Sequence, residues 1–144
     1  MADRVRPKFS EGENGGRMMA ETASLLESKW ALDETQQGLE KTFNFPTYAK
    51  ALDFILLIGV ETKLHNHHPE LRNVRPFSVR FAQSTRLTAS SQSYKSVFYH
   101  WTTHKPRGLS SKDIRMARLC EEKANLLGYL TGGENEQKAP PSVT

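Results

Sequence analysis

Two hydrophobic patterns alternate along the chain and predict its helices and strands. Apolar residues at helical spacing predict helices at residues 21–29, 47–66 and 110–130. Alternating apolar and polar residues predict strands at residues 30–32, 39–45 and 94–104. Because helices and strands are mixed in this order, we expect an α+β fold in which helices pack on one face of an antiparallel, four-stranded sheet.

The same patterns predict which side chains face the core. On the strands these are Leu39, Phe43 and Phe45, with Lys41 on the same side, and then Val97, Tyr99 and Trp101. On the long helix they are Tyr48, Ala51, Leu52, Ile55, Ile58 and Thr62. On the last helix they are Ile114, Ala117, Cys120, Ala124 and Leu127.

The long helix carries more apolar residues than one contact with a sheet requires. Leu56, Leu57 and Val60 lie outside its predicted core stripe. Either this surplus mediates self-association into a dimer or tetramer, or a tail or loop of the chain covers it. The pattern alone favours neither.

Both ends of the chain lack an apolar period. Residues 1–20 and 131–144 mix charged residues, glycine and proline, so we expect disordered tails around one folded domain at residues 21–130. We expect no transit peptide at the N-terminus, because acidic residues interrupt its basic ones, and no secretory segment.

Composition narrows the classes of function. The chain has 144 residues, a formal net charge of +4 and one cysteine. A single cysteine excludes an intramolecular disulfide and a cysteine-rich zinc module, and it favours a reducing, cytoplasmic location, with the nucleus as a second compartment. The basic residues are scattered, so nucleic-acid binding is not expected. The longest apolar run, at residues 54–60, is too short to span a membrane.

The histidines form the clearest chemical signal. All five fall within residues 65–104, and three of them lie in the stretch HNHHPE at residues 65–70. Imidazole exchanges protons near neutral pH and is the commonest metal ligand, so the cluster indicates acid–base chemistry or a metal site. Pro69 disfavours the helical conformation for the residue before it, which predicts that the long helix ends here and that His67 and His68 lie on irregular backbone.

The residues around these histidines resemble the pterin-4a-carbinolamine dehydratase family. The likeness runs from Trp30 to Leu127 and rests on two distant motifs, HHPE at residues 67–70 and THKPRGLSSKD at residues 103–113. Further positions that carry it are Phe43, Phe45, Tyr48, Ala51, Phe54, Asn73 and Val74. The resemblance implies dehydration of 4a-hydroxytetrahydrobiopterin to the quinonoid dihydropterin, a step that recycles tetrahydrobiopterin and needs no metal or redox cofactor.

The resemblance also implies roles for single residues. His67 and His104 would be the acids that face the 4a-hydroxyl group, and His68 would bind the substrate and also serve as a base. Asp113 would orient His104 from the last helix. These residue types suit the reaction, because loss of the hydroxyl needs a general acid and loss of the N5 proton needs a general base.

The remaining residues of the two motifs and the other histidines divide into two groups. The resemblance implies that Glu70 and Thr103 contact the substrate. His65 and His100 have no trusted counterpart in the family, so we interpret them as surface or half-buried polar residues.

Two of these assignments have simpler alternatives. Ser110 and Asp113 match a capping box, so the carboxylate could serve only the start of the last helix, although both roles could coexist. A zinc site competes for the histidine cluster as a whole. Against it, His65 and His67 would diverge on a helix, and Glu70 is the only acid nearby.

The chain departs from the family pattern in two ways. Lys63 stands where many relatives carry an acid, and Leu71 follows HHPE where an aromatic residue is frequent, which puts pterin affinity in doubt. Residues 75–93 form an insertion, because joining Val74 directly to Tyr94 restores the family's spacing. The insertion is either a surface excursion with a hairpin at FSVRF, which loop-closure entropy tolerates, or a retained intron translated in frame.

Two rival functions stay open at this stage. The resembled family also includes proteins that bridge the dimerisation helices of transcription factors, and such a role would use the apolar face of the long helix. The substrate could also be another pterin, such as a molybdopterin-related one.

Overall fold

A computed structural model of the chain describes residues 6–74 and 94–131. The elements in these residues are α1 (Gly15–Glu27), β1 (Ala31–Leu32), β2 (Gly38–Asn44), α2 (Tyr48–His65), β3 (Glu70–Val74), β4 (Ser96–His104), β5 (Arg107–Gly108) and α4 (Ser111–Leu126). Most of the predicted elements are therefore present, with shifted ends. The strands β3 and β5 were not predicted.

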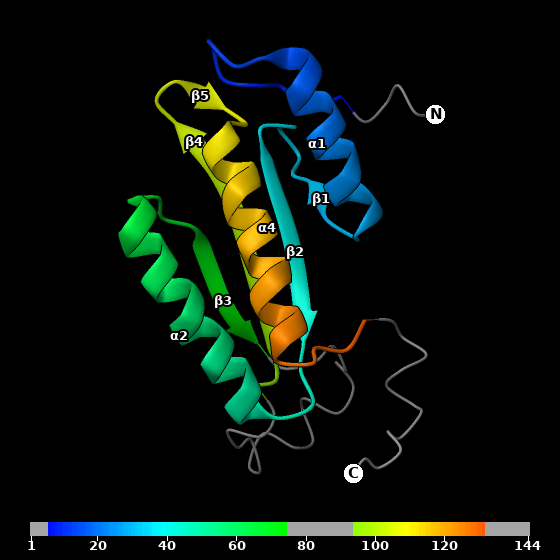
Figure 1. The fold of residues 1–144 in the computed structure, drawn as a ribbon, viewed down its shortest axis with the longest axis vertical. Helices are drawn as coiled ribbons and strands as arrows, with labels where there is room; N and C mark the ends of the chain where they lie inside the picture. Colours follow the sequence, from blue (N-terminus) through cyan, green and yellow to red (C-terminus); the bar gives the residue numbers. More distant parts are fainter. Residues whose placement is uncertain (1–5, 75–93, 132–144) are drawn as a thin grey trace.

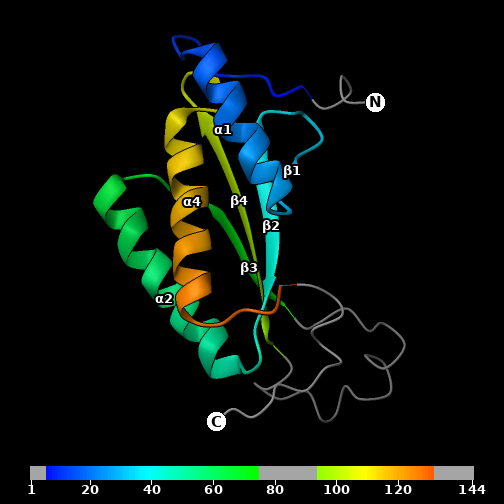
Figure 2. The same ribbon diagram turned by 45° about the vertical axis from the view of Figure 1, so that its right-hand side comes forward.

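The strands form one antiparallel sheet, and the helices cover one of its faces. The strand order is β1-β2-β4-β3, and the short β5 pairs with the end of β4. Helices α1, α4 and α2 lie side by side over the sheet, with α4 in the middle (Figure 1). Turning the molecule by 45° keeps all three on the same side of the strands (Figure 2). The predicted α+β class, with helices on one face of an antiparallel sheet, is confirmed.

The predicted core faces of the strands and of the last helix are confirmed. The strand residues Leu39, Phe43, Phe45, Val97, Tyr99 and Trp101 are each at most 1% exposed. The α4 residues Ile114, Ala117, Cys120 and Ala124 are also buried, and Leu127 packs against them. Phe43 lies at the centre, with its ring centroid 4.9 to 5.7 Å from those of Trp30, Phe54 and Tyr129.

Lys41 lies on this buried face because polar partners surround its ammonium group. The ammonium donates to Glu121 Oε2 at 2.5 Å, to the Ser28 carbonyl at 2.6 Å and to the Tyr129 hydroxyl at 3.1 Å. Trp30 Nε1 donates to the same carboxylate oxygen at 2.8 Å. Burial and the neighbouring Glu121 carboxylate raise the pKa of Tyr129 to about 12. This network offsets the cost of burying the ion pair and ties α4 to β2.

The disordered tail predicted for residues 1–20 is wrong for residues 6–20. The first helix begins at Gly15, where the Asn14 side chain accepts from a backbone N–H of the first turn. The segment before it pairs with the chain beyond β5, since the Ser10 N–H donates to the Leu109 carbonyl. A side chain on Gly108 would lie 2.7 Å from the Ser10 nitrogen, so this crossing requires glycine. Backbone pairing with a segment far away in sequence does not require an apolar period in the N-terminal residues, so the hydrophobic pattern could not predict that they are ordered.

The core stripe predicted for α2 is partly wrong. Ala51 and Ile58 are buried as expected, but Leu52 is 39% exposed and Phe54 packs into the core in its place. The surplus residues Leu56, Leu57 and Val60 do lie outside the core, with 61%, 37% and 57% exposure. The helix has apolar residues around most of its circumference, so periodicity could not fix which side faces the sheet.

The predictions for residues 75–93 and for the C-terminal tail cannot be compared with the fold. Both segments lie outside the described residues, apart from Thr131. The described residues that flank the insertion do lie side by side, because Val74 pairs with Ser96 and Asn73 Nδ2 donates to the Tyr94 carbonyl at 3.1 Å. This closeness agrees with the spacing argument that defined the insertion.

We predict that Phe43→Ala lowers the free energy of unfolding by about 3–5 kcal/mol, because it leaves a cavity among the core rings. Leu56→Ala is the matched control, since Leu56 is 61% exposed, and we expect it to change stability by less than about 1 kcal/mol. Chemical denaturation of both variants measures the difference. Similar losses in the two variants would contradict the assignment of the core.

Candidate active site

The histidine-rich segment leaves α2 close to the predicted end of the helix. Asn66 adopts a left-handed conformation, with φ of 52°, and its N–H donates back to carbonyls of the last helical turn. The helix therefore ends at His65, one residue before the predicted end at residue 66. The chain then crosses to β3 through His67 and His68 on irregular backbone, as expected.

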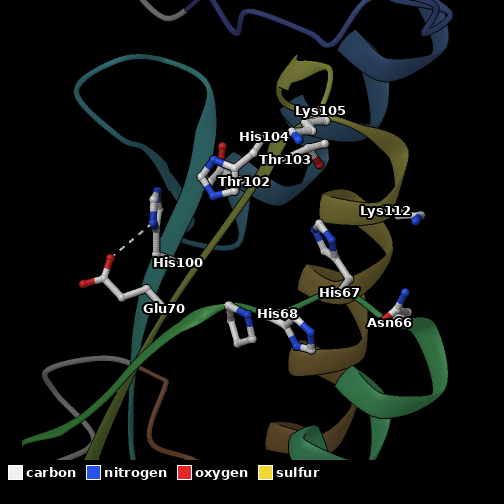
Figure 3. Close-up of a pocket in the computed structure, with 11 residues that line it drawn as sticks. Asn66, His67, His68, Glu70, His100, Thr102, Thr103, His104, Lys105 and Lys112 are labelled. Carbon is white, nitrogen blue, oxygen red and sulfur yellow. Dashed lines mark ion pairs between the residues drawn. The ribbon is translucent and has the colours of Figure 1, made fainter.

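A difference in strand length opens the edge of the sheet beside this segment. β3 pairs with β4 only between Ser96 and His100, whereas β4 continues to His104. Residues 101–104 therefore have no β3 neighbour on that side. A pocket of about 650 Å³ lies here, lined by Asn66, His67, His68, Pro69, Glu70, His100, Thr102, Thr103, His104, Lys105 and Lys112 (Figure 3).

His67 is held by a buried carboxylate and an aromatic ring. Its Nε2 lies 2.5 Å from Asp113 Oδ1, and its ring stacks on Trp101 at a centroid distance of 5.8 Å and an interplanar angle of 16°. Asp113 is fully buried, and its other oxygen, Oδ2, accepts from the Thr103 hydroxyl at 2.8 Å and from the Ser110 backbone N–H at 2.9 Å. One carboxylate thus caps α4 with one oxygen and holds His67 with the other.

The contacts of Asp113 confirm the predicted capping box and a contact with a histidine, but they correct which histidine is contacted. The capping box of Ser110 and Asp113 is present, and it coexists with a contact to a histidine. That histidine is His67, so the prediction that Asp113 orients His104 is wrong. Among the described residues, no hydrogen bond or ion pair joins Asp113 to His104. The reason is strand parity, because the odd-numbered residues Trp101 and Thr103 face α4 whereas His104 points to the opposite side of β4.

The structure brings the other predicted site residues to the same pocket. His68 lies in the loop after α2, Glu70 begins β3, and Thr103 and His104 end β4, and all four line the pocket. Figure 3 shows the imidazoles of His67, His68 and His104 on the walls of this pocket. His68 and His104 are exposed, whereas His67 is half-buried. The roles assigned to these residues stay predictions.

Sequence reasoning missed His100, which also lines the pocket. Its Nε2 lies 2.7 Å from Asp33 Oδ2, and its Nδ1 lies 3.4 Å from Glu70 Oε1. The period-2 rule could have found it, because residues 100, 102 and 104 share one face of the predicted strand. Other lining residues that were missed are Asn66, Thr102, Lys105 and Lys112. His65 does not line the pocket and pairs with Glu61 at 3.4 Å.

The described residues contain neither a candidate metal-binding cluster nor a candidate membrane-spanning helix. Within residues 6–74 and 94–131, no group of three or more histidine, cysteine or acidic side chains is placed to hold a metal ion. Over the same ranges, no helix is long and apolar enough to cross a bilayer.

We predict that Asp113→Ala lowers the free energy of unfolding by about 1–3 kcal/mol, because it leaves the Ser110 N–H and the Thr103 hydroxyl without their buried acceptor. The matched control is Glu122→Ala, which removes an exposed acid from the same helix. In NMR spectra of Asp113→Ala, the imidazole signals of His67 should shift more than those of His104. A larger shift at His104 would contradict the pairing.

Comparison with known proteins places the chain in a family. The family model described as pterin 4 alpha carbinolamine dehydratase matches residues 17–89, about half of the chain. The match includes the HHPE motif, whereas His104 and Asp113 lie beyond its end.

Individual relatives extend the likeness. A Rhizobium etli protein, whose name provisionally gives the same dehydratase, is 30% identical over 105 residues, which cover 73% of this chain and 83% of that protein. The pterin-4-alpha-carbinolamine dehydratase of Drosophila melanogaster is 32% identical over 103 residues, which cover 72% of this chain but only 44% of that longer protein.

A solved structure has the same fold. The crystal structure of a transcriptional coactivator/pterin dehydratase from Brucella melitensis superposes with a TM-score of 0.56 at 23% identity, covering 74% of this chain and 92% of that one. This likeness concerns the fold alone. Together with the matches of the family model and of the sequence relatives, it leads to one conclusion: the chain belongs to the pterin-4-alpha-carbinolamine dehydratase family.

Proposed function

We propose that this protein dehydrates 4a-hydroxytetrahydrobiopterin to the quinonoid dihydropterin by histidine acid–base catalysis. The observation that carries the proposal is the convergence of three imidazoles on one pocket, two from the loop after α2 and one from the end of β4. Family membership supports the general activity. The particular pterin and the histidine roles rest on the chemistry of the pocket.

The reaction needs one proton donor and one proton acceptor. The C4a–O bond breaks as the hydroxyl takes a proton and leaves as water. The N5–H bond gives its proton to a base, and its electron pair forms the double bond between N5 and C4a. Imidazoles suit both steps because they exchange protons near neutral pH.

The contact between Asp113 and His67 suits His67 to the role of acid. A buried carboxylate that accepts from one ring nitrogen fixes the orientation of the imidazole and leaves the other nitrogen for proton transfer to the substrate. His104 is the second group assigned to the 4a-hydroxyl, and it acts without help from Asp113. His68 binds the substrate and takes the N5 proton. Thr103 both supports Asp113 and lines the pocket.

The open edge of β4 favours a flat, polar heterocycle as the ligand. Because β3 stops opposite His100, backbone groups at residues 101–104 have no partner in β3, the described strand on that side. A pterin carries hydrogen-bond donors and acceptors along its pyrimidine ring, so it can use such groups. The stacking of His67 on Trp101 also keeps one imidazole in a fixed plane.

We predict that His68→Ala slows the decay of 4a-hydroxytetrahydrobiopterin by about 100-fold or more, because it removes the base. His65→Ala is the matched control, since His65 lies just beyond the pocket and pairs with Glu61. Absorbance of the quinonoid product follows the rate with purified protein. Equal rates for both variants and the wild type would refute histidine catalysis at this site.

A second candidate function uses the outer face of α2, which we propose as a surface for self-association or for bridging the helices of another protein. Five apolar side chains lie exposed along this helix: Leu52, Leu56, Leu57, Val60 and Leu64. Their spacing of three and four residues places them on one face. A solved relative that shares the fold is named a transcriptional coactivator as well as a dehydratase.

We predict that the wild type sediments as a dimer or larger oligomer and that the double variant Leu56→Glu, Val60→Glu sediments as a monomer, because charges replace the most exposed apolar contacts at the centre of this face. Lys50→Glu on the same helix is the control for added negative charge. Sedimentation velocity at micromolar concentration measures both. A wild type that is already monomeric would remove self-association and leave the bridging role.

A further inference from the structure

The pocket has one acidic end and one basic end. Glu70 is the only carboxylate among the residues that line it, whereas Lys105 and Lys112 lie at its other end. Figure 3 shows Glu70 and His100 together on one side and the two lysines on the other. A ligand with hydrogen-bond donors along one edge can therefore direct that edge at Glu70, which is the carboxylate on the pocket lining.

The pyrimidine edge of a pterin carries two such donors, the N3–H and the 2-amino group. A carboxylate can accept both at once, as it does from a guanidinium, and the paired geometry gives specificity as well as affinity. The Glu70 side chain is 56% exposed, and its Oε2 lies 3.6 Å from Nε of the exposed Arg72, a surface ion pair that restrains the carboxylate little. Something must hold it for paired recognition to operate.

His100 lies where it can hold Glu70. The two residues are opposite each other in the β3–β4 register, and His100 Nδ1 lies 3.4 Å from Glu70 Oε1. The other ring nitrogen, Nε2, lies 2.7 Å from Asp33 Oδ2. Both nitrogens thus face carboxylates, and neither is left for the substrate. This excludes His100 from proton transfer to a ligand and suits it to positioning.

Asp33 is itself fixed by the turn between β1 and β2. Its Oδ1 accepts from the Thr35 N–H at 3.0 Å, the Thr35 hydroxyl at 2.7 Å and the Gln37 N–H at 3.2 Å, which leaves Oδ2 for His100. Burial raises the pKa of Asp33, but the hydrogen bonds from His100, Thr35 and Gln37 outweigh it and hold the pKa below its ordinary value. The carboxylate is therefore charged at neutral pH.

The backbone leaves room for this pair. A side chain on Gly38 would lie 2.5 Å from Asp33 Oδ2 and 2.6 Å from His100 Nε2. The absence of a side chain at this position of β2 allows the carboxylate and the imidazole to meet over the strand.

We propose that His100, anchored by Asp33, is a positioning residue that holds Glu70 so that the pocket selects ligands with a 2-aminopyrimidine edge. The selection rests on the proposed function, since it assumes that the pocket takes a pterin. It adds to that function the chain of residues, Asp33, His100 and Glu70, that recognises the 2-amino edge by which a pterin differs from a 2-oxo pteridine.

The test compares two stable ligands, 7,8-dihydrobiopterin and its 2-oxo counterpart with the same side chain. Isothermal titration calorimetry measures the affinity of each for the wild type and for Glu70→Gln, His100→Phe and Asp33→Asn. We expect the wild type to prefer the 2-amino ligand by about tenfold or more, as paired hydrogen bonds do in base recognition. Each of the three variants should lose most of this preference by binding the 2-amino ligand more weakly.

Controls separate positioning from a structural role. Glu34→Gln changes the same turn by one charge at an exposed residue and should keep the full preference. His100→Gln can still donate a hydrogen bond and should restore part of it. The double variant with Glu70→Gln and His100→Phe should lose no more than Glu70→Gln alone, because both act through one contact.

Two results would overturn the inference. One is an equal loss of affinity for both ligands in His100→Phe, and the other is additive losses in the double variant. If His100→Phe does not fold, Asp33→Asn gives the same readout. The calorimetry measures binding and not catalysis, so the two proposals can fail separately. If the protein prefers the 2-amino ligand but does not dehydrate its substrate, only the proposed catalysis is refuted. Turnover without an effect of His100 on ligand preference would refute only the inference.

Discussion

The buried carboxylate of Asp113 joins three parts of the fold at one point. It accepts the N–H that begins α4, accepts the hydroxyl of Thr103 from β4, and lies against His67 from the loop after α2. A carboxylate without exposure to water must have its oxygens occupied, so these contacts depend on one another. The position of the central imidazole is thus tied to the start of the helix that covers the sheet.

The pocket owes its existence to a mismatch between neighbouring strands. β4 is longer than β3 at the end where the chain leaves α2, and the left-handed turn at Asn66 directs the histidine segment across the uncovered edge. An open edge would ordinarily invite pairing with another chain. Here the loop, the imidazoles and the β5 turn surround it, which converts an edge that is available for pairing into a site that is available to a small ligand.

Two carboxylate–imidazole pairs lie on opposite faces of β4, and they differ in what they leave free. His67 has one nitrogen on Asp113 and the other without a partner among the described residues, which suits proton transfer. His100 has carboxylates at both nitrogens, which suits support of Glu70. In the roles we propose, the same residue type therefore serves two purposes, and the number of acidic neighbours of each imidazole separates them.

The sequence by itself determined the fold class, the buried faces of the strands and of α4, and five of the pocket residues, namely His67, His68, Glu70, Thr103 and His104. Those features follow from local periodicity and from motifs that any chain with this pattern shares. Only the tertiary structure decided which carboxylate meets which imidazole. The choice of His67 over His104 as the partner of Asp113 depends on which face of β4 lies under α4, and the role of His100 depends on a turn more than sixty residues away in sequence. Long-range contacts likewise decided how the N-terminal segment packs and which side of α2 faces the sheet. An irregular segment has no hydrophobic period that would predict its partner, and a helix that is apolar on most sides does not indicate which side is buried.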